Sequence, residues 1–480
     1  MSDSAAACQF DASPEEALTA LRGHSGLMLI DLDETLYLRN STEDFLDCAR
    51  PAWMVVLVLR ILDACRPWML TGRDTRDNWR VAVVSTMFPW IWWRWKARVR
   101  LLADRHANVE LAAALRSRDE PFVILTAGFR SIVTPLLHAM GFGNETILAA
   151  RTFALADRRE GKLRMAAREL GTGAVADSLV LTDSMADDEL MRACGTALRT
   201  RWPTARYVRA HSRIYIPGEY VSRIKHPGER YILRAILQDD FAFWILSSIG
   251  LAANWSVHVA GLLFLLVSFW CIYERGYVDN DAVASSFEEY PKLTSAFGEG
   301  QFSVSLVQPW IWALVSGAIG IAILNPETSA FLRFAGVWVV VLLLVHFTFR
   351  IYNRLDKQTR LWVYPLLQMS RAASFATIVA IEPVGVAALS AHAFARWVPY
   401  ASYRFARSTD WPKVPTALFR LIGFVLISLI LAASVGWHTL STWSALAILL
   451  WNVIRARHEL RSALRSCHRI DRKAPENAEV

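Results

Sequence analysis

The chain lacks the features of several common protein classes. Its six cysteines are scattered over 480 residues without a C-x-x-C pair, which argues against a disulfide framework or a zinc site and indicates reduced thiols. Residues 1–26 include Asp and Glu and no apolar core, so no secretory signal is visible there. No sequence module typical of nucleic-acid binding is present. These absences predict that the N-terminal part stays in the cytoplasm.

Charged residues are missing from one long stretch in the second half. Phe241 to Tyr273 contains no Asp, Glu, Lys or Arg and exceeds the roughly 20 residues of one membrane span. Asn254 and Trp255 predict a turn between two spans at its middle. Together with the 54% of hydrophobic residues, this pattern is typical of a multi-pass membrane protein. Further apolar stretches bring the predicted total to about eight spans: 306–324, 329–349, 362–382, 384–399, 416–436 and 440–454.

Basic residues are distributed unevenly among the loops between these stretches. Lys and Arg follow the fourth, sixth and eighth spans and are almost absent from the odd-numbered loops. Because loops rich in Lys and Arg stay on the cytoplasmic side, the pattern predicts a multi-pass protein of the cell membrane with both termini cytoplasmic. The same loops explain the net charge of +8. The basic segment 204–238 before the first span is predicted to lie against the anionic membrane surface.

In the first half, a short hydrophobic run ends in two carboxylates. Leu27 to Ile30 is too short for a helix and predicts a buried strand, which places Asp31 and Asp33 at its C-terminal end. Open α/β sheets bind their ligands at this edge. Two carboxylates at this spacing suit phosphoryl transfer, in which one attacks phosphorus and the other manages the proton of the leaving group. A hard divalent cation would neutralise the charge between carboxylate and phosphate.

Later apolar runs end in polar residues in the same way. Thr126 ends one run, and Asp183 and Asp187 follow another in a D-x-x-x-D pattern, with Lys162 shortly before it. In this order the elements, beginning with the motif DLDETLY, resemble the motifs of the haloacid dehalogenase superfamily of phosphatases. The alternatives are ordinary strands capped by polar turns and, for Lys162, a plain surface lysine in a basic stretch.

The resemblance implies a fold and a set of roles. The fold is α/β, a Rossmann-type parallel sheet with a helical cap. Asp31 would be the nucleophile and Asp33 the general acid and base, while Thr126 and Lys162 would hold the phosphoryl oxygens. The implied ligands of Mg²⁺ are Asp31, the backbone carbonyl of Asp33 and Asp183, with Asp187 in support.

The insert between the first two motifs, about 38–117, is predicted to be the cap that selects the substrate. It is rich in Trp between Trp53 and Trp95, and Trp alternates with Arg and Lys near its end. This composition is typical of a segment at a membrane interface. A tightly packed helical cap with an aromatic core is the alternative.

An acidic segment after the second predicted span is a second candidate site. Asn280, Asp281 and Glu288 are predicted to lie in a cytoplasmic loop, where clustered acids can hold Mg²⁺ and, through it, a diphosphate. The segment and the number of spans are similar to the UbiA family of intramembrane prenyltransferases. The family pattern N-D-x-x-D-x-x-x-D meets Ala284 and Glu288 here, and Asp410 alone stands for its second acidic motif. A solvated acidic loop is the alternative.

The sequence therefore predicts an α/β part followed by an all-α multi-pass membrane part. The predicted function is a membrane-tethered, Mg²⁺-dependent phosphatase that hydrolyses a phosphomonoester through an aspartyl-phosphate. The tether suggests a polyprenyl- or otherwise lipid-linked substrate, and membrane lipids as further partners. The predicted boundaries are 1–203 for the phosphatase domain, 204–238 for the linker, 239–457 for the UbiA-like domain and 458–480 for a basic cytoplasmic tail.

Two other functions remain open at this point. One is a bifunctional prenyltransferase with an accessory phosphatase domain. The other is a membrane scaffold or transporter with an attached enzyme, which charged residues facing each other within the spans would favour. The candidates for such residues are Arg333, Arg371, Glu382 and Arg396.

Overall fold

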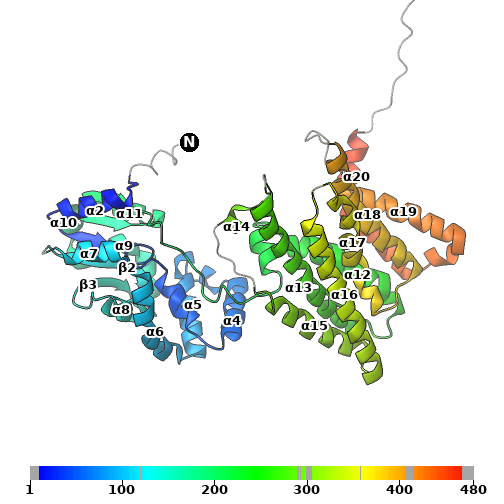
Figure 1. Cartoon of the computed structure of the whole chain (residues 1–480), viewed down its shortest axis with the longest axis horizontal. Coiled ribbons are helices and arrows are strands. Elements are labelled where there is room, and N and C mark those ends of the chain that lie inside the picture. The colour runs from blue at the N-terminus through cyan, green and yellow to red at the C-terminus, as the bar shows by residue number, and fades with distance from the viewer. Residues whose placement is uncertain are drawn as a thin grey trace, which may run out of the picture. The chain divides into compact units, whose positions relative to one another are not determined.

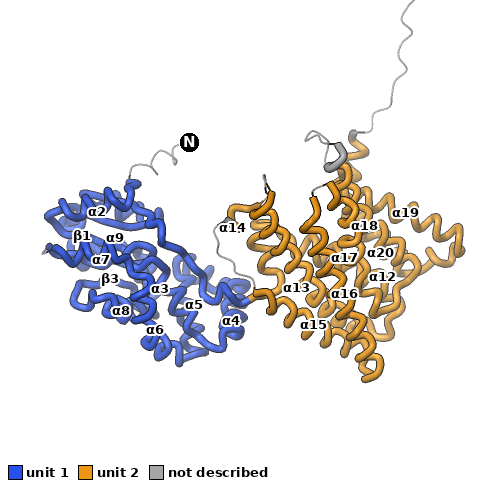
Figure 2. Tube along the Cα trace, in the orientation of Figure 1, with its two compact units in different colours: residues 1–214 blue, residues 215–480 orange. Residues whose placement is uncertain are grey.

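The computed structural model describes residues 10–118, 120–288, 291, 293–298, 305–356, 358–406 and 414–466. The chain divides into two compact units, residues 1–214 and 215–480 (Figure 2). Each unit has its own hydrophobic core. Asp410 and residues 467–480 of the predicted tail lie outside the described residues.

A five-stranded parallel sheet forms the centre of unit 1 (Figure 1). The middle strand is the run predicted around residues 27–30, and it is buried throughout and pairs in parallel on both sides. The predicted α/β fold with a parallel sheet is therefore confirmed. In spatial order the strands are β3 (Thr146–Ala150), β2 (Phe122–Phe129), β1 (Met28–Ile30), β4 (Leu179–Thr182) and β5 (Thr196–Arg199).

Helices connect these strands and pack on the sheet. The first begins with a capping box, in which the side chains of Ser13 and Glu16 each accept a hydrogen bond from the other's backbone N–H. The helices 130–139 and 155–170 each contact both β2 and β3. The helices outside the insert are α2 (Pro14–Gly23), α8 (Arg130–Ala139), α9 (Leu155–Leu170), α10 (Thr172–Ala176), η3 (Met185–Asp187) and α11 (Asp188–Ala193).

The insert between β1 and β2 is helical, and its Trp-rich part has two environments. Trp95 is fully buried and donates to the backbone oxygen of Ile132, and Trp92 packs on Phe45 with ring centroids 4.6 Å apart. Trp93, by contrast, is 72% exposed. The segment thus supplies both an aromatic core and an exposed aromatic surface. The helices of the insert are α3 (Ser41–Asp47), α4 (Ala52–Cys65), η1 (Pro67–Met69), η2 (Arg73–Thr75), α5 (Arg76–Met87), α6 (Ile91–His106) and α7 (Val109–Arg116).

A buried ion pair joins the insert to the segment that follows β5. The carboxylate of Glu43 on α3 accepts two hydrogen bonds from Arg80 on α5, at 2.5 and 2.9 Å. The same carboxylate accepts from the hydroxyl of Tyr207 and from the backbone N–H of Ala210. Because both charged side chains are almost fully buried, removing Arg80 would leave the charge of Glu43 uncompensated, whereas Arg80 also pairs with Asp77 at 3.1 Å.

Unit 2 is made of helices. Three of them, α13 (Trp255–Phe287), α16 (Thr328–Arg354) and α19 (Thr416–Val435), are long and apolar enough to cross a membrane, and α15 (Gln308–Leu324) is apolar but shorter. These counts refer to the described ranges alone. The remaining helical segments are η4 (Val221–Lys225), η5 (Ile232–Phe241), α12 (Ala242–Ser248), η6 (Ile249–Leu251), α14 (Ser295–Gly298), α17 (Arg360–Ala373), η7 (Ser374–Thr377), α18 (Pro383–Ala406), η8 (Trp437–Leu440) and α20 (Trp443–Ser466).

The turn predicted near residue 254 is present, but the loop predicted after the second span is not. Asn254 caps α13, and its side chain accepts from the backbone N–H groups of residues 256 and 257. The helix then continues to Phe287, so Asn280 and Asp281 are helical rather than in a loop, which corrects the prediction. No Pro or Gly lies between residues 277 and 287 to end the helix earlier.

The unit boundary falls inside the segment 204–238. Its first part hydrogen-bonds within unit 1, where Tyr207 and Ala210 contact Glu43. Its next part belongs to unit 2, where the buried carboxylate of Glu274 on α13 accepts from the hydroxyl of Tyr215 and from the backbone N–H of Val221. Both halves of the segment are therefore anchored by buried carboxylates.

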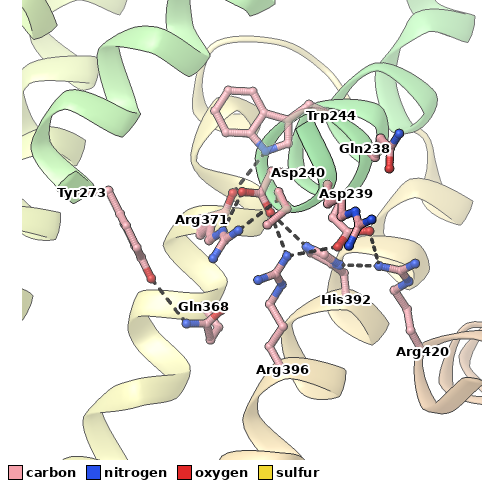
Figure 3. Close-up of polar contacts among 12 residues, drawn as sticks. Gln238, Asp239, Asp240, Trp244, Tyr273, Gln368, Arg371, His392, Arg396 and Arg420 are labelled. Carbon is pink, nitrogen blue, oxygen red and sulfur yellow. Dashed lines mark hydrogen bonds and ion pairs between the residues drawn. The ribbon is translucent and has the colours of Figure 1, made fainter. Parts of the chain in front are cut away.

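A network of charged side chains lies in the interior of unit 2 (Figure 3). Asp239 and Asp240, at the end of η5, face basic side chains from four other helices. Arg371 on α17 donates to Asp240 at 2.6 Å, and Arg420 on α19 donates to Asp239 at 3.0 Å. The other members are His392 and Arg396 on α18 and Arg455 on α20. Four arginines thus share two carboxylates, an excess of positive charge in a largely apolar bundle.

Candidate active site

The ends of three neighbouring strands meet at one pocket of unit 1. Asp31 follows β1, Thr126 lies in β2, and Asp183 follows β4. Because these strands are parallel and adjacent, their carboxyl ends share one edge of the sheet. The pocket has a volume of about 210 Å³ and is also lined by Asp33 and Lys162. Every residue predicted for the phosphatase site therefore lies at this pocket.

Asp31 is held by hydrogen bonds on both carboxylate oxygens. Its Oδ1 accepts from the backbone N–H of Leu32 at 2.8 Å and lies 2.8 Å from Nζ of Lys162. Its Oδ2 lies 3.1 Å from the hydroxyl of Thr182, which is closer, at 2.6 Å, to Asp187. The side chain is 7% exposed. Burial raises the pKa of Asp31, and the nearby ammonium of Lys162 opposes that shift.

Lys162 bridges the carboxylates of Asp31 and Asp187. Its Nζ lies 2.7 Å from Asp187 as well as 2.8 Å from Asp31. Burial disfavours the ammonium, but these two carboxylates outweigh burial and raise the pKa of Lys162. The lysine is therefore charged at neutral pH. Asp187 acts as the residue that positions it.

A break in α9 directs Lys162 into the pocket. Gly161 has φ 75° and ψ 172° within the range of this helix, so the helix changes direction just before Lys162. This region of backbone conformation is essentially restricted to glycine. In an unbroken helix Lys162 would lie among the other basic residues of α9. Gly161 therefore changes the direction of the chain immediately before the lysine that enters the pocket.

A tight turn after β1 places Asp33. Backbone hydrogen bonds from Thr35 and Tyr37 to the oxygen of Leu32 close the turn, and Glu34 has the uncommon φ of 60°. The carboxylate of Asp33 accepts from the backbone N–H of Ser41 at 2.7 Å. Burial raises the pKa of Asp33 to about 7, and the neighbouring charge of Asp31 adds to the shift. A carboxyl group with this pKa can both give and take a proton at neutral pH.

The hydroxyl of Thr126 is oriented by the backbone. Its Oγ1 accepts from the N–H of Gly128 at 2.9 Å, which leaves the hydroxyl proton free to donate. A side chain at Gly128 would meet Val133 at 2.8 Å and Thr126 at 3.2 Å, so glycine permits this close turn. Thr126 is 1% exposed and lines the pocket, where its proton can reach a phosphoryl oxygen.

The geometry agrees with the family comparison. The family model described as haloacid dehalogenase-like hydrolase matches residues 28–192. Residues 28–192 form a haloacid dehalogenase-like hydrolase domain. Comparisons of the chain with curated proteins and with solved structures give no significant match. The resemblance of the second part to the UbiA family finds no support in these comparisons and stays a prediction.

The charges of the haloacid dehalogenase-like pocket favour a cation. Within the described part of the chain, no three Asp, Glu, His or Cys side chains converge as a metal-binding group. The predicted set needs only two, Asp31 and Asp183, with one backbone oxygen, and both carboxylates line the pocket. Burial and the charges of Asp31 and Glu34 raise the pKa of Asp183 to about 7. The lining acids Asp31, Asp33, Glu34, Asp77, Asp183 and Asp187 outnumber the lining bases Arg158 and Lys162.

This donor set fits Mg²⁺, because hard divalent cations prefer carboxylate and carbonyl oxygens. A bound cation would also favour the charged carboxylates, against the burial and the lesser mutual repulsion that raise their pKa values. The residues that would hold it are Asp31, Asp183 and the backbone carbonyl of Asp33. Asp187 is committed to Lys162 and Thr182 and supports the site through them.

The structure adds residues that the sequence analysis missed. Arg158 on α9 lines the pocket and pairs with Asp77 of the insert at 3.1 Å, which ties the insert to the rim of the site. Glu34 lines the pocket as well. Glu34 lies inside the motif DLDETLY, so the sequence already placed it next to the predicted site residues. Arg158 was not distinguishable from the other basic residues of α9, because only the fold brings it opposite Asp77.

The two acids of the second predicted group, Asp281 and Glu288, have different basic partners. Asp281 is buried, accepts from the hydroxyl of Tyr220 at 2.9 Å and pairs with Lys225 at 2.5 Å. Glu288 instead pairs with Arg360 at 2.8 Å. Asn280 donates to Asp281 at 3.4 Å. These acids therefore have protein partners, and a role for Asn280, Asp281 and Glu288 in binding a diphosphate stays a prediction.

Proposed function

We propose that this protein is a membrane-bound, Mg²⁺-dependent phosphatase that hydrolyses a phosphomonoester through an aspartyl-phosphate. One observation carries the proposal: Asp31 ends the central strand within 2.8 Å of Lys162, beside a second carboxyl whose pKa is about 7. A nucleophile, a fixed cation and a proton donor are thereby gathered in one small pocket.

In the first step a carboxylate oxygen of Asp31 attacks phosphorus. The bond between phosphorus and the leaving oxygen breaks, and protonated Asp33 gives its proton to that oxygen. Lys162 and the hydroxyl of Thr126 hold the phosphoryl oxygens. A bound Mg²⁺ would supply neutralisation of the charge shared by the carboxylate and the phosphoryl group.

In the second step Asp33, now a carboxylate, takes a proton from a water molecule. The resulting hydroxide attacks phosphorus, the bond to Asp31 breaks, and inorganic phosphate leaves. Asp33 is protonated again, so both residues return to their starting states. Its pKa of about 7 supports this double role, because neither form is strongly favoured at neutral pH.

A lipid-linked substrate and membrane attachment are supported by the rest of the chain. Three helices of unit 2 are long and apolar enough to cross a membrane. The insert exposes large apolar side chains, among them Trp53 at 63%, Leu57 at 54% and Trp93 at 72%. Such side chains suit the interface between lipid and water. The proposed location is the cell membrane, with both termini on the cytoplasmic side.

The test is phosphate release by the purified full-length protein from a panel of soluble and polyprenyl or other lipid-linked phosphomonoesters. Asp31→Asn should lower release by at least about a thousandfold, because an amide cannot attack phosphorus. Asp188→Asn is the matched control, since Asp188 pairs with Arg192 outside the pocket, and should retain activity. Turnover by Asp31→Asn close to that of the natural protein would refute the assignment.

A second candidate function rests on the charged network of unit 2. Arg371 and Arg396, two of the residues whose pairing would favour transport, lie with Asp239 and Asp240 in the bundle. Nη2 of Arg420, which is buried, has no hydrogen-bond partner among the described residues. This excess of donors supports a membrane part that binds or carries an anionic solute. Uptake by vesicles containing the Asp31→Asn protein would separate this activity from hydrolysis.

A further inference from the structure

A second cavity lies in unit 2, where α13, α15 and α16 meet. Its volume is about 540 Å³, which is enough for a phosphorylated headgroup. Trp310 of α15 lines it, together with one face of α13 and one face of α16. None of the residues of the charged network or of the pair Asn280 and Asp281 lines this cavity.

The lining is basic on one side. His346, Arg350 and Arg354 follow one another at intervals of four residues and so share one face of α16. Across the cavity, α13 contributes Arg275, which pairs with Asp279 four residues later. Arg350 and Arg354 have no ion-pair partner among the described residues. Three arginines and one carboxylate therefore line the cavity, and two of the arginines are available to a ligand.

The position of the cavity along the helices matches the level of lipid phosphates. α13 has 33 residues and so is about 50 Å long, which exceeds the roughly 30 Å of a hydrocarbon core. Arg275 and Asp279 lie in the part of α13 beyond its apolar stretch. Arg350 and Arg354 lie in the last turns of α16, the ends of spans where basic residues contact headgroups.

We infer that this cavity binds the phosphate of an anionic phospholipid. Arg350 and Arg354 would contact the phosphate, while exposed apolar side chains at the rim, such as Phe287 and Leu306, would contact the acyl chains. Basic pockets between membrane-spanning helices bind anionic headgroups in this way. The inference rests on the proposed membrane location of unit 2 but does not depend on phosphatase activity.

Asn353 narrows the class of headgroup. It lines the same cavity and is 3% exposed, and its Nδ2 donates to the backbone oxygen of Gly276. Its Oδ1 has no hydrogen-bond partner among the described residues. A hydroxyl group of the headgroup would satisfy this acceptor. A lipid that carries both a phosphate and a hydroxyl, such as phosphatidylglycerol, fits the cavity better than phosphatidylcholine.

The experiment uses full-length protein in detergent with phosphatidylcholine, to which phosphatidylglycerol is added. Bound lipid is counted by native mass spectrometry, and thermal stability is followed in parallel. The double variant Arg350→Gln/Arg354→Gln should bind phosphatidylglycerol at least about tenfold more weakly. Arg333→Gln is the matched control, because Arg333 lies on the same helix, stacks on Phe334 and is not part of the cavity. It should bind as the natural protein does.

Equal binding of phosphatidylglycerol by the double variant and the natural protein would overturn the inference. Equal binding of phosphatidylcholine and phosphatidylglycerol by the natural protein would overturn it as well. If soluble glycerol phosphate displaced the lipid at a concentration similar to that of the lipid, the cavity would bind a soluble ligand rather than a lipid, and the inference would be wrong. Failure of the phosphatase proposal is seen separately, because Asp31→Asn should still bind the lipid while losing hydrolysis.

Discussion

At the scale of residues, the candidate site depends on carboxylates that repel one another. Asp33 and Asp183 both have a pKa of about 7, chiefly because burial penalises their charged forms. Such groups are costly to the fold and useful to the reaction. A charged lysine between Asp31 and Asp187 offsets part of this repulsion. The remainder is what a divalent cation would relieve.

The raised pKa of Asp33 predicts a pH-dependent stability. The pKa of Asp33 is about 7 in the folded state and 3.8 in an unfolded chain, so its favourable contribution is complete below pH 3.8 and is lost as the pH rises through 7. Without divalent cations, Asp33→Asn should therefore stabilise unit 1 by about 1–2 kcal/mol at pH 8 relative to pH 5, a value reduced because the side chain is only half-buried. The Asn side chain can still accept from Ser41.

Hydrogen exchange of peptides from β2, read by mass spectrometry, measures this difference as the free energy of opening of unit 1. The natural protein and Asp33→Asn are compared at both pH values in the presence of a chelator. A variant that is equally or less stable than the natural protein at pH 8 would contradict the shifted pKa.

The sequence was most informative about residues at strand ends. Asp31, Asp33, Thr126 and Asp183 follow short apolar runs, and parallel strands bring such ends together, so their meeting was predictable. The residue that pairs with Lys162 could not be predicted in this way. Asp187 was expected to support a metal, whereas it contacts Lys162 and Thr182 directly, a detail set by side-chain geometry rather than by spacing.

At the scale of elements, helix ends and breaks decide where functional groups point. α9 is broken at Gly161, and α13 continues through residues 274–287, which were predicted to belong to a loop. The glycine was visible, but a single glycine within a helical pattern is usually tolerated. In α13 the residues after Tyr273 are polar and include Gly276, so composition suggested a loop where the backbone stays helical.

The break in α9 can be tested directly. Gly161→Ala should lower the rate of hydrolysis about ten- to a hundredfold, because the substituted backbone resists φ 75° and shifts Lys162 away from Asp31. A Cβ atom at this position meets no other atom within 4 Å, so crowding cannot explain the loss. The measurement is kcat for a soluble phosphomonoester.

Gly173→Ala in α10 is the matched control, because its Cβ also meets nothing within 4 Å and its φ is not positive. It should leave kcat unchanged. If Gly161→Ala were as active as this control, the break in α9 would have no role in placing Lys162.

At the scale of the whole molecule, the chain joins two units that have separate cores and separate polar centres. The site of unit 1 contains no residue of unit 2. In unit 2 the adjacent Asp239 and Asp240 were missed by the sequence analysis, because they immediately precede the uncharged stretch that begins at Phe241 and were not considered among the charges within spans. Arg371 and Arg396 were noticed as charges within spans, but only the helix packing shows what they face.

This separation predicts that unit 2 is not needed for the chemical step. Asp281→Asn removes the charge that pairs with Lys225 in unit 2. In the full-length protein it should leave kcat for a small soluble phosphomonoester within about twofold, since Asp281 is not part of the pocket and is held by Tyr220 and Lys225 of unit 2. A folded Asp281→Asn protein that no longer hydrolyses the soluble substrate would show that the two acidic groups form one site.

The most direct test of the account is to identify the residue that becomes phosphorylated. The full-length protein is mixed with Mg²⁺ and a substrate that it hydrolyses, quenched in acid within one turnover, and digested for mass spectrometry. The account predicts that one phosphoryl group is found on Asp31, and that it is absent from Asp31→Asn. Hydrolysis that proceeds with no phosphoryl group on Asp31, or with one on another residue, would contradict it.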